Sequence, residues 1–278
     1  MKRRRCLMTC AAGVLGAGLF LTVPGKRAAK EAYAPFQNRN VAHRGLFEAD
    51  QSIPENSLAA FSRAVEAGYG IELDVQLSKD GKVVVFHDDD LKRVCGVDQP
   101  VSALTFRQLQ KLSLCGTQEK IPLFTDVLKL VAGKVPMIVE LKAGRQNKLL
   151  CGKTKAILDE YHGEFCVESF DPRIMGWFKK NMPEVVRGQL SCQMDGYKAG
   201  TPKLTSYVLS RCMMNFISRP QFIAYKVGPQ PFSVRLAERL GAKKVCWTSH
   251  DPDNEKWYDT VIFEHYRPVV WYKMCEKA

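Results

Sequence analysis

The sequence is most informative in residues 70–87, which read GIELDVQLSKDGKVVVFH. Two apolar runs, Ile71–Leu77 and Val83–His87, flank a turn signal at Ser78–Gly81. The link between the runs is far too short for a parallel crossover, which needs about a dozen residues or more. The sequence therefore predicts an antiparallel hairpin here, and the second run is set aside when parallel strands are counted.

On both sides of this hairpin, apolar runs alternate with amphipathic stretches of helical length, such as Ser57–Gly68 and Phe232–Leu240. This alternation is typical of a parallel sheet covered by helices. Eight candidate strands remain, the number that a TIM-type (β/α)8 barrel requires. They are Val41–Arg44, Ile71–Leu77, Met137–Leu141, Cys166–Phe170, Val186–Leu190, Phe222–Val227, Lys244–Thr248 and Val261–Phe263.

The N-terminus has the pattern of a membrane segment. Lys2–Arg5 are basic and precede an uncharged stretch, Cys6–Gly25, about long enough to cross a bilayer core. Basic residues on this side favour an N-inside orientation with the remainder exported. We therefore expect a transmembrane anchor in residues 1–25, a polar tether in 26–40 and one extracellular barrel domain in 41–278 at the cell membrane. The alternative is a cleaved signal peptide and a secreted protein.

The composition limits which classes of partner the protein is expected to bind. The formal net charge of +12 suits acidic partners such as phosphates or anionic membranes. No basic helix with interleaved aromatic residues is present, so we expect no nucleic-acid partner. The ten cysteines contain no C-x-x-C pair and no close Cys/His cluster, so they predict no zinc site. Their number alone favours a reducing compartment, which conflicts with export.

Three carboxylates fall at the carboxyl ends of predicted strands, where barrel enzymes carry their functional residues. Glu72 and Asp74 alternate along one strand and therefore project from the same face, and Glu140 ends the next parallel strand. Buried carboxylates are costly unless they are paired or hold a metal ion. The sequence therefore predicts that Glu72, Asp74 and Glu140 bind a hard divalent cation, Ca²⁺ or Mg²⁺.

Two histidines and two cations accompany these carboxylates. His43 ends the first predicted strand, and the hairpin brings His87 roughly opposite Glu72. Two histidines beside such an ion can serve as general base and general acid. Arg44 and Lys142 supply positive charge for phosphate oxygens. The other histidines, His162, His250 and His265, have no predicted metal ligand or catalytic residue near them in the sequence, and we assign them no role.

At these positions the sequence resembles the glycerophosphodiester phosphodiesterase family, of the membrane-anchored bacterial type. The matching stretches are Ala42–Gly45, Pro54–Ser57 with Ala60-Phe61, Gly70–Val75, Asp80-Gly81, Phe86–Asp88, Ile121-Pro122, Glu140–Lys142, Glu168–Phe170 and Trp247-Thr248. They run in order over nearly the whole part expected to be exported.

The resemblance implies a barrel of the phospholipase C-like phosphodiesterase kind that splits glycerophosphodiesters into sn-glycerol 3-phosphate and an alcohol. It implies that Glu55 borders the site and that Trp247 lines the substrate floor. It also implies that the substrate's own 2-hydroxyl attacks phosphorus and that a cyclic phosphate is then hydrolysed. The catalytic pair, the metal ligands and the phosphate-binding residues would be those named above.

Two departures from the family pattern stand out. Glu264 follows the last strand where the family usually has Thr-Asp, and Ser249-His250 replaces the common Val-Asn. Both are expected to affect the rim of the site and the choice of alcohol. The alternatives that remain are a poly(glycerol phosphate) teichoic acid or a lysophospholipid as substrate, and a catalytically retired phosphate-binding barrel.

Overall fold

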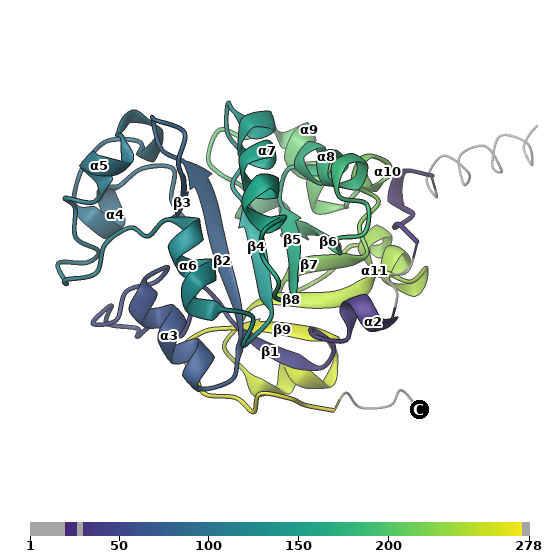
Figure 1. Ribbon diagram of the computed structural model, residues 1–278. Coiled ribbons are helices and arrows are strands. Elements are labelled where there is room, and N and C mark those ends of the chain that lie inside the picture. Colours follow the sequence, from purple (N-terminus) through teal and green to yellow (C-terminus); the bar gives the residue numbers. More distant parts are fainter. Residues whose placement is uncertain (1–19, 27–29, 274–278) are drawn as a thin grey trace, which may run out of the picture.

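Eight parallel strands close into a barrel in the computed structural model, which describes residues 20–26 and 30–273 (Figure 1). Neighbouring strands follow the order β1-β9-β8-β7-β6-β5-β4-β2, and β1 pairs with β2 to close the circle. The predicted TIM-type (β/α)8 barrel is therefore confirmed. Its strands are β1 (Arg39–Ala42), β2 (Gly70–Leu77), β4 (Met137–Leu141), β5 (Phe165–Ser169), β6 (Arg187–Ser191), β7 (Phe222–Lys226), β8 (Lys243–Ser249) and β9 (Thr260–Phe263).

The predicted hairpin is also confirmed. Strand β3 (Val83–Val85) runs antiparallel to β2, with Val75 opposite Val85. Val84 and Phe86 pack into a separate apolar cluster that also contains Leu91, Val94, Val101, Leu109, Leu114 and Ile121. We call residues 83–123 the arm. It contains α4 (Lys92–Cys95), η1 (Val101–Ala103) and α5 (Phe106–Leu109), and Figure 1 shows it as a lobe beside β2.

Helices cover the outside of the barrel (Figure 1). The first, α3 (Leu58–Glu66), begins as the sequence predicts, because the Ser57 hydroxyl accepts a hydrogen bond from the amide of Ala60. It ends before Gly68, whose φ is +78°. The others are α6 (Phe124–Val131), α7 (Asn147–Leu158), α8 (Pro172–Asn181), α9 (Lys203–Ser210), α10 (Asn215–Ser218) and α11 (Phe232–Arg239), with η2 (Met194–Gly196) and η3 (Pro252–Lys256) in connections.

Two apolar layers result from the alternation of side chains along each strand. Met137 and Val139 of β4 face outward and pack in the main layer between the sheet and the helices. Ile138 faces inward and packs inside the barrel with residues from other strands, such as Cys166 and Val245. Cys166 is thus a small core residue.

Part of the expected tether belongs to the domain. The chain forms α2 (Lys30–Tyr33), and both Tyr33 and Phe36 are buried with the apolar residues inside the barrel. The Tyr33 hydroxyl lies 2.8 Å from the Thr260 hydroxyl. Irregular segments carry no periodic signal, which is why the sequence did not reveal this packing. Of the expected anchor, residues 1–19 lie outside the described residues. Among the described residues, no helix is both long and apolar enough to cross a membrane.

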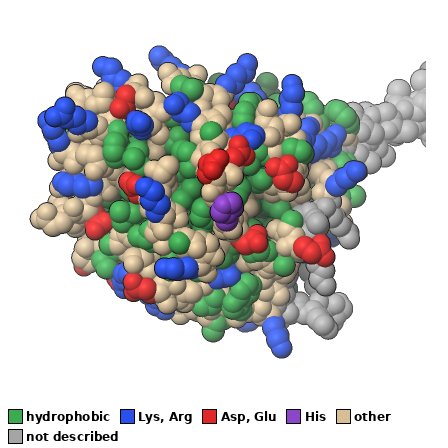
Figure 2. All heavy atoms as spheres, in the orientation of Figure 1, with side chains coloured by type: hydrophobic (Ala, Val, Ile, Leu, Met, Phe, Trp, Pro, Cys, Tyr) green, Lys and Arg blue, Asp and Glu red, His purple; other side chains and the backbone are tan. Residues whose placement is uncertain are grey.

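Charged side chains of both signs are interspersed on one face of the domain (Figure 2). On the face shown in Figure 2, Lys and Arg side chains are distributed widely with acidic side chains between them, and they do not gather into one basic patch.

Candidate metal-dependent active site

The three predicted metal ligands lie together at the carboxyl ends of two adjacent strands. Glu72 and Asp74 project from β2, and Glu140 lies directly beside Asp74 in the parallel pairing with β4. One ligand oxygen from each carboxylate lies within 4.8 Å of the others. All three side chains are buried, with exposures of 2%, 1% and 7%. This is the arrangement of oxygen ligands that a hard cation requires.

The electrostatics of the carboxylates differ. Burial, followed by repulsion from Asp74 and Glu140, raises the pKa of Glu72 well above its ordinary value. Burial acts in the same direction on Asp74. There, however, the charges of Lys142, His87 and Arg44 outweigh it and hold the pKa well below the ordinary value. Glu72 is therefore the carboxylate that has most to gain from a bound cation.

A fourth buried carboxylate strengthens this conclusion. Glu168 lies beside Glu140 in the pairing of β4 with β5, and it is 1% exposed. Its Oε2 atom has no hydrogen-bond partner among the described residues. Burial, followed by repulsion from Glu140 and Asp74, raises the pKa of Glu168 well above its ordinary value. A divalent cation would relieve this repulsion among buried carboxylates, and the oxygen donor set fits it.

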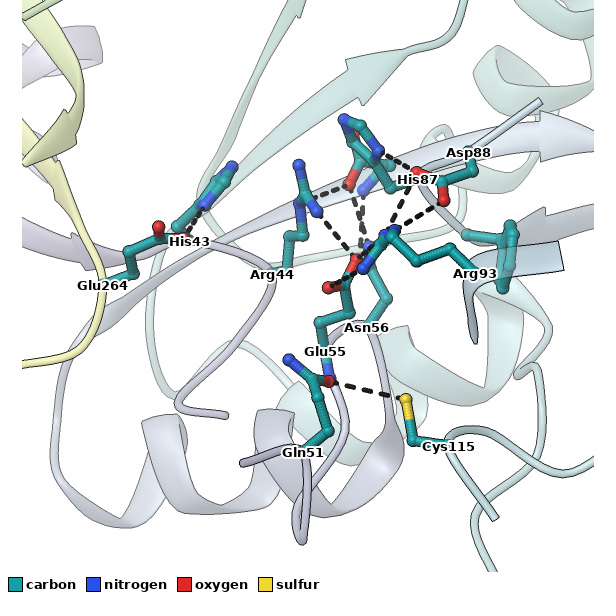
Figure 3. A network of polar contacts seen from close by, with 12 residues as sticks. His43, Arg44, Gln51, Glu55, Asn56, His87, Asp88, Arg93, Cys115 and Glu264 are labelled. Carbon is teal, nitrogen blue, oxygen red and sulfur yellow. Dashed lines mark hydrogen bonds and ion pairs between the residues drawn. The ribbon is translucent and has the colours of Figure 1, made fainter. Parts of the chain in front are cut away.

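His43 is oriented by a carboxylate from the last strand. Its Nδ1 atom lies 2.7 Å from Oε2 of Glu264, which directly follows β9, and its Nε2 atom lies 3.9 Å from Oε2 of Glu72 (Figure 3). Burial, and then the charge of Arg44, lowers the pKa of His43, although Glu264 acts in the opposite direction. The neutral imidazole that donates its Nδ1–H to Glu264 presents the Nε2 lone pair to the carboxylates.

The two departures from the family pattern meet at Glu264. Its Oε1 atom lies 3.4 Å from Nε2 of His250 and 3.5 Å from Nε2 of His265, and these two imidazoles stack with centroids 5.6 Å apart. Burial opposes ionisation, but the hydrogen bond and charge of His43, with the charges of His265 and His250, lower the pKa of Glu264 to about 2. We expected Glu264 to affect only the rim of the site, but it contacts the predicted catalytic residue His43. We also expected His250 and His265 to lie apart from charged residues, but both lie close to Glu264.

His87 leaves β3 and is held by its sequence neighbour. Its Nδ1 atom lies 2.6 Å from Oδ1 of Asp88, and its side chain is about one-third exposed. Asp88 in turn accepts from Arg93 of α4 at 2.7 Å. Arg93 also donates to both oxygens of Glu55, at 2.8 and 2.7 Å. His87 is thus positioned by the arm, whereas His43 is positioned by the barrel (Figure 3).

In the loop after β1, Arg44 and Asn56 donate hydrogen bonds to carboxylates of the site. The amide of Arg44 donates to Glu72 at 3.0 Å, and its guanidinium donates to Glu55 at 2.7 Å. Asn56 donates to Asp74 at 2.8 Å. Gly45, with a φ of +81°, allows the tight turn, because a Cβ there would come within 2.9 Å of the backbone of Ala60. Glu55 therefore borders the site through an ion pair with Arg44.

Lys142 contacts two of the site carboxylates, and Trp247 packs among aromatic side chains. The Lys142 ammonium lies 2.9 Å from Glu140 and 3.2 Å from Asp74. The half-buried Trp247 indole sits edge-on to Phe170, with centroids 5.5 Å apart, and Phe170 contacts Tyr197 in the same way at 6.0 Å. These three aromatic side chains form one cluster.

Comparison with known proteins gives a family match over most of the chain. A sequence model of the glycerophosphoryl diester phosphodiesterase family matches residues 43–264. A glycerophosphodiester phosphodiesterase of Caldanaerobacter subterraneus subsp. tengcongensis is 39% identical over 113 residues, 37% of this chain and 45% of that protein. A lysophospholipase D of Rattus norvegicus is 31% identical over 172 residues, 57% of this chain and 53% of that protein. The chain thus matches about half the length of these relatives.

Solved structures share the fold. A phosphodiesterase of Oleispira antarctica, in complex with the product sn-glycerol-3-phosphate, superimposes with a TM-score of 0.67 at 22% identity, covering 84% of this chain and 94% of that one.

Proposed function

The chain belongs to the glycerophosphoryl diester phosphodiesterase family, and we propose that it hydrolyses glycerophosphodiesters to sn-glycerol 3-phosphate and an alcohol with the help of a divalent metal ion. The observation that carries this proposal is the convergence of Glu72, Asp74 and Glu140 at one point. A Ca²⁺ or Mg²⁺ ion held there would stabilise negative charge on the oxygens around phosphorus.

His43 is our proposed general base. Its lowered pKa keeps the imidazole neutral near pH 7, and Glu264 fixes the tautomer whose Nε2 faces the carboxylates. In the proposed first step, Nε2 takes the proton of the substrate's 2-hydroxyl while that oxygen attacks phosphorus. The second histidine, His87, would give a proton to the leaving alcohol. Water would then open the cyclic phosphate, and the two histidines would exchange roles.

Arg44 and Lys142 are proposed to orient the phosphate. Both cations are anchored by site carboxylates, at 2.7 Å from Glu55 and 2.9 Å from Glu140 respectively, so little side-chain entropy remains to be lost when a substrate binds. Trp247 would contact the glycerol or the alcohol as an apolar floor.

A lysophospholipid is a second candidate substrate. The observation that favours it is the partly exposed aromatic cluster of Phe170, Tyr197 and Trp247, in which Phe170 directly follows β5, the strand that carries Glu168. The similarity to the rat lysophospholipase D points in the same direction. Poly(glycerol phosphate) is a further alternative, and only the assay below separates it from smaller diesters.

We further propose that the uncharged N-terminal stretch anchors the protein in the cell membrane with the barrel outside; residues 20–25, which we had expected within the anchor, pack against the barrel domain instead. The support is the sequence pattern of Lys2–Arg5 followed by an uncharged stretch. The alternative remains a cleaved signal peptide and secretion.

The test is release of sn-glycerol 3-phosphate by the full chain in detergent micelles, with Ca²⁺, with Mg²⁺ and with chelator. Substrates are glycerophosphocholine, poly(glycerol phosphate) and lysophosphatidylcholine; for the last of these the product measured is lysophosphatidic acid, because the acyl chain stays on the glycerol. We expect metal-dependent release that His43→Ala and Glu72→Ala abolish. The matched controls are His162→Ala and Glu160→Ala, which remove exposed side chains of the same types. Absence of release from every substrate with either metal would refute hydrolysis and favour the retired barrel.

A further inference from the structure

A second cluster of cations lies at the opposite end of the barrel from the carboxylates. There, residues 20–26, the end of α8 and the starts of β6 and β7 line an open cavity of about 560 Å³. Four of its lining side chains are basic, namely Lys26, Lys179, Arg187 and Arg219, and none of the described residues that line it is acidic. We call this the basal basic site. Figure 1 shows residues 20–26 beside α8 and α10.

Arg187 lines this site and is fixed in place by hydrogen bonds. It is the first residue of β6 and is 5% exposed. One of its terminal nitrogens donates to the carbonyls of Pro183 and Val185, at 3.2 and 3.1 Å. Its Nε atom is buried and has no hydrogen-bond partner among the described residues. Because this atom has almost no accessible surface, Arg187 contributes its positive charge to the cavity, and the lining donors that a ligand can reach include the ammonium groups of Lys26 and Lys179.

The neighbouring cations repel one another. Burial, and then the charges of Arg219 and Arg187, lowers the pKa of Lys179. Burial also lowers the pKa of Arg187, and the charge of Glu184 only opposes this effect. Convergent cations without a lining carboxylate destabilise the site unless an anion joins them. The local charge therefore favours a bound anion.

The site is held in shape by its contacts. Arg219 donates from Nη1 to the carbonyl of Val23 at 2.8 Å, and its guanidinium lies 5.1 Å from the ring centre of Phe20. Phe20 stacks on Phe216 and remains 57% exposed. The cationic cavity thus has an exposed aromatic edge next to it. The uncharged stretch of the sequence, Cys6–Gly25, ends in the wall of this cavity.

We propose that the basal basic site binds a phosphate group. Guanidinium and ammonium groups recognise phosphate oxygens by charge-assisted hydrogen bonds, and the Lys179 ammonium uses one of its three N–H groups for the carbonyl of Ile217, at 2.9 Å, which leaves donors for a ligand. The group has two sources, a soluble phosphate or the headgroup of an anionic phospholipid. Neither source involves the carboxylate centre at the other end of the barrel, so the inference is independent of the proposed hydrolysis.

The experiment uses the full chain in detergent micelles with chelator. Inorganic phosphate is titrated by calorimetry, and retention of phosphatidylglycerol or phosphatidylcholine is measured by native mass spectrometry. The variant is Lys26→Gln/Lys179→Gln. Arg187 is left intact, because its hydrogen bonds to Pro183 and Val185 support the fold. The matched control, Lys180→Gln/Lys203→Gln, removes two exposed charges that do not line the cavity.

We expect the variant to bind at least one phosphate-bearing probe about tenfold more weakly than the control, the change expected when one charge-assisted hydrogen bond is lost. Weaker retention of phosphatidylglycerol alone identifies a lipid headgroup as the source. Weaker binding of inorganic phosphate identifies a soluble ligand. Equal binding of both probes by the variant and the control overturns the proposal. Hydrolysis of glycerophosphocholine should be unchanged in both variants, so this result is separate from the test of the active site.

Discussion

The substitution Glu264→Gln measures how much the carboxylate behind His43 contributes to catalysis. It keeps the size of the side chain and an oxygen that can accept from Nδ1, but it removes the negative charge that lies 2.7 Å from the ring. A hydrogen bond to a charged group contributes roughly 1.5–3 kcal/mol and a neutral one about 0.5–1.5. The difference, on the order of 1–2 kcal/mol, predicts a fall in kcat/KM of about 5- to 30-fold near neutral pH.

The pH profile provides a second readout. Glu264 raises the pKa of His43, while burial and Arg44 hold it below its ordinary value of 6.5. Removing the carboxylate lowers this pKa further, so the acid limb of kcat/KM moves to lower pH. A larger fraction of His43 then stays neutral at low pH, so the difference in kcat/KM between the wild type and the variant should narrow as the pH falls from about 7 to about 5.

The assay is release of sn-glycerol 3-phosphate at saturating metal over this pH range. Glu48→Gln is the matched control, because Glu48 pairs with Arg63 and Arg267 and has no contact with His43. Equal losses in the two variants, or a loss in Glu264→Gln that does not vary with pH, would refute the positioning role of Glu264.

Three further outcomes are expected. Glu72→Gln should abolish the rise in melting temperature that Ca²⁺ or Mg²⁺ causes. In chelator the variant should melt no lower than the wild type, because the substitution removes a buried carboxylate that is repelled by its neighbours. Differential scanning fluorimetry measures both melting temperatures. Asn56→Ala loses a buried donor and retains a φ of +54°, so urea unfolding should show a loss of about 2 kcal/mol. Gly188→Ala drives a methyl group into the ring of Phe222 and should cost roughly 1–3 kcal/mol by the same measurement.

The barrel could be predicted from the sequence because its decisive signals are local. The short link at Ser78–Gly81 identified the hairpin, and the remaining apolar runs then numbered eight. The position of the carboxylates followed from a rule of the fold, that the ends of parallel strands meet at one edge. Strand boundaries were less accurate. Strand β1 ends at Ala42 and not at Arg44, because Arg44 takes a positive φ as the chain turns.

The remaining features depend on contacts between distant residues. Glu264 and His43 are 221 positions apart, and no periodicity links them. The signal that could have found Glu264 was its place directly after a predicted strand, which is also the position of Lys142. Glu168 was present in a recognised stretch, but only the register of β4 with β5 places it beside Glu140.

The separate supports of the two histidines have a consequence for how this active site can diversify. His43 is fixed by the closed barrel, while His87 stands on the arm, whose apolar cluster is its own. Insertions or deletions within residues 96–121, which leave Asp88 and Arg93 in place to hold His87, can therefore change the arm without moving the metal ligands, since lengthening a surface connection costs little in closure entropy. Variation in this outer part of the arm is thus a route to new leaving-group preferences on an unchanged metal centre.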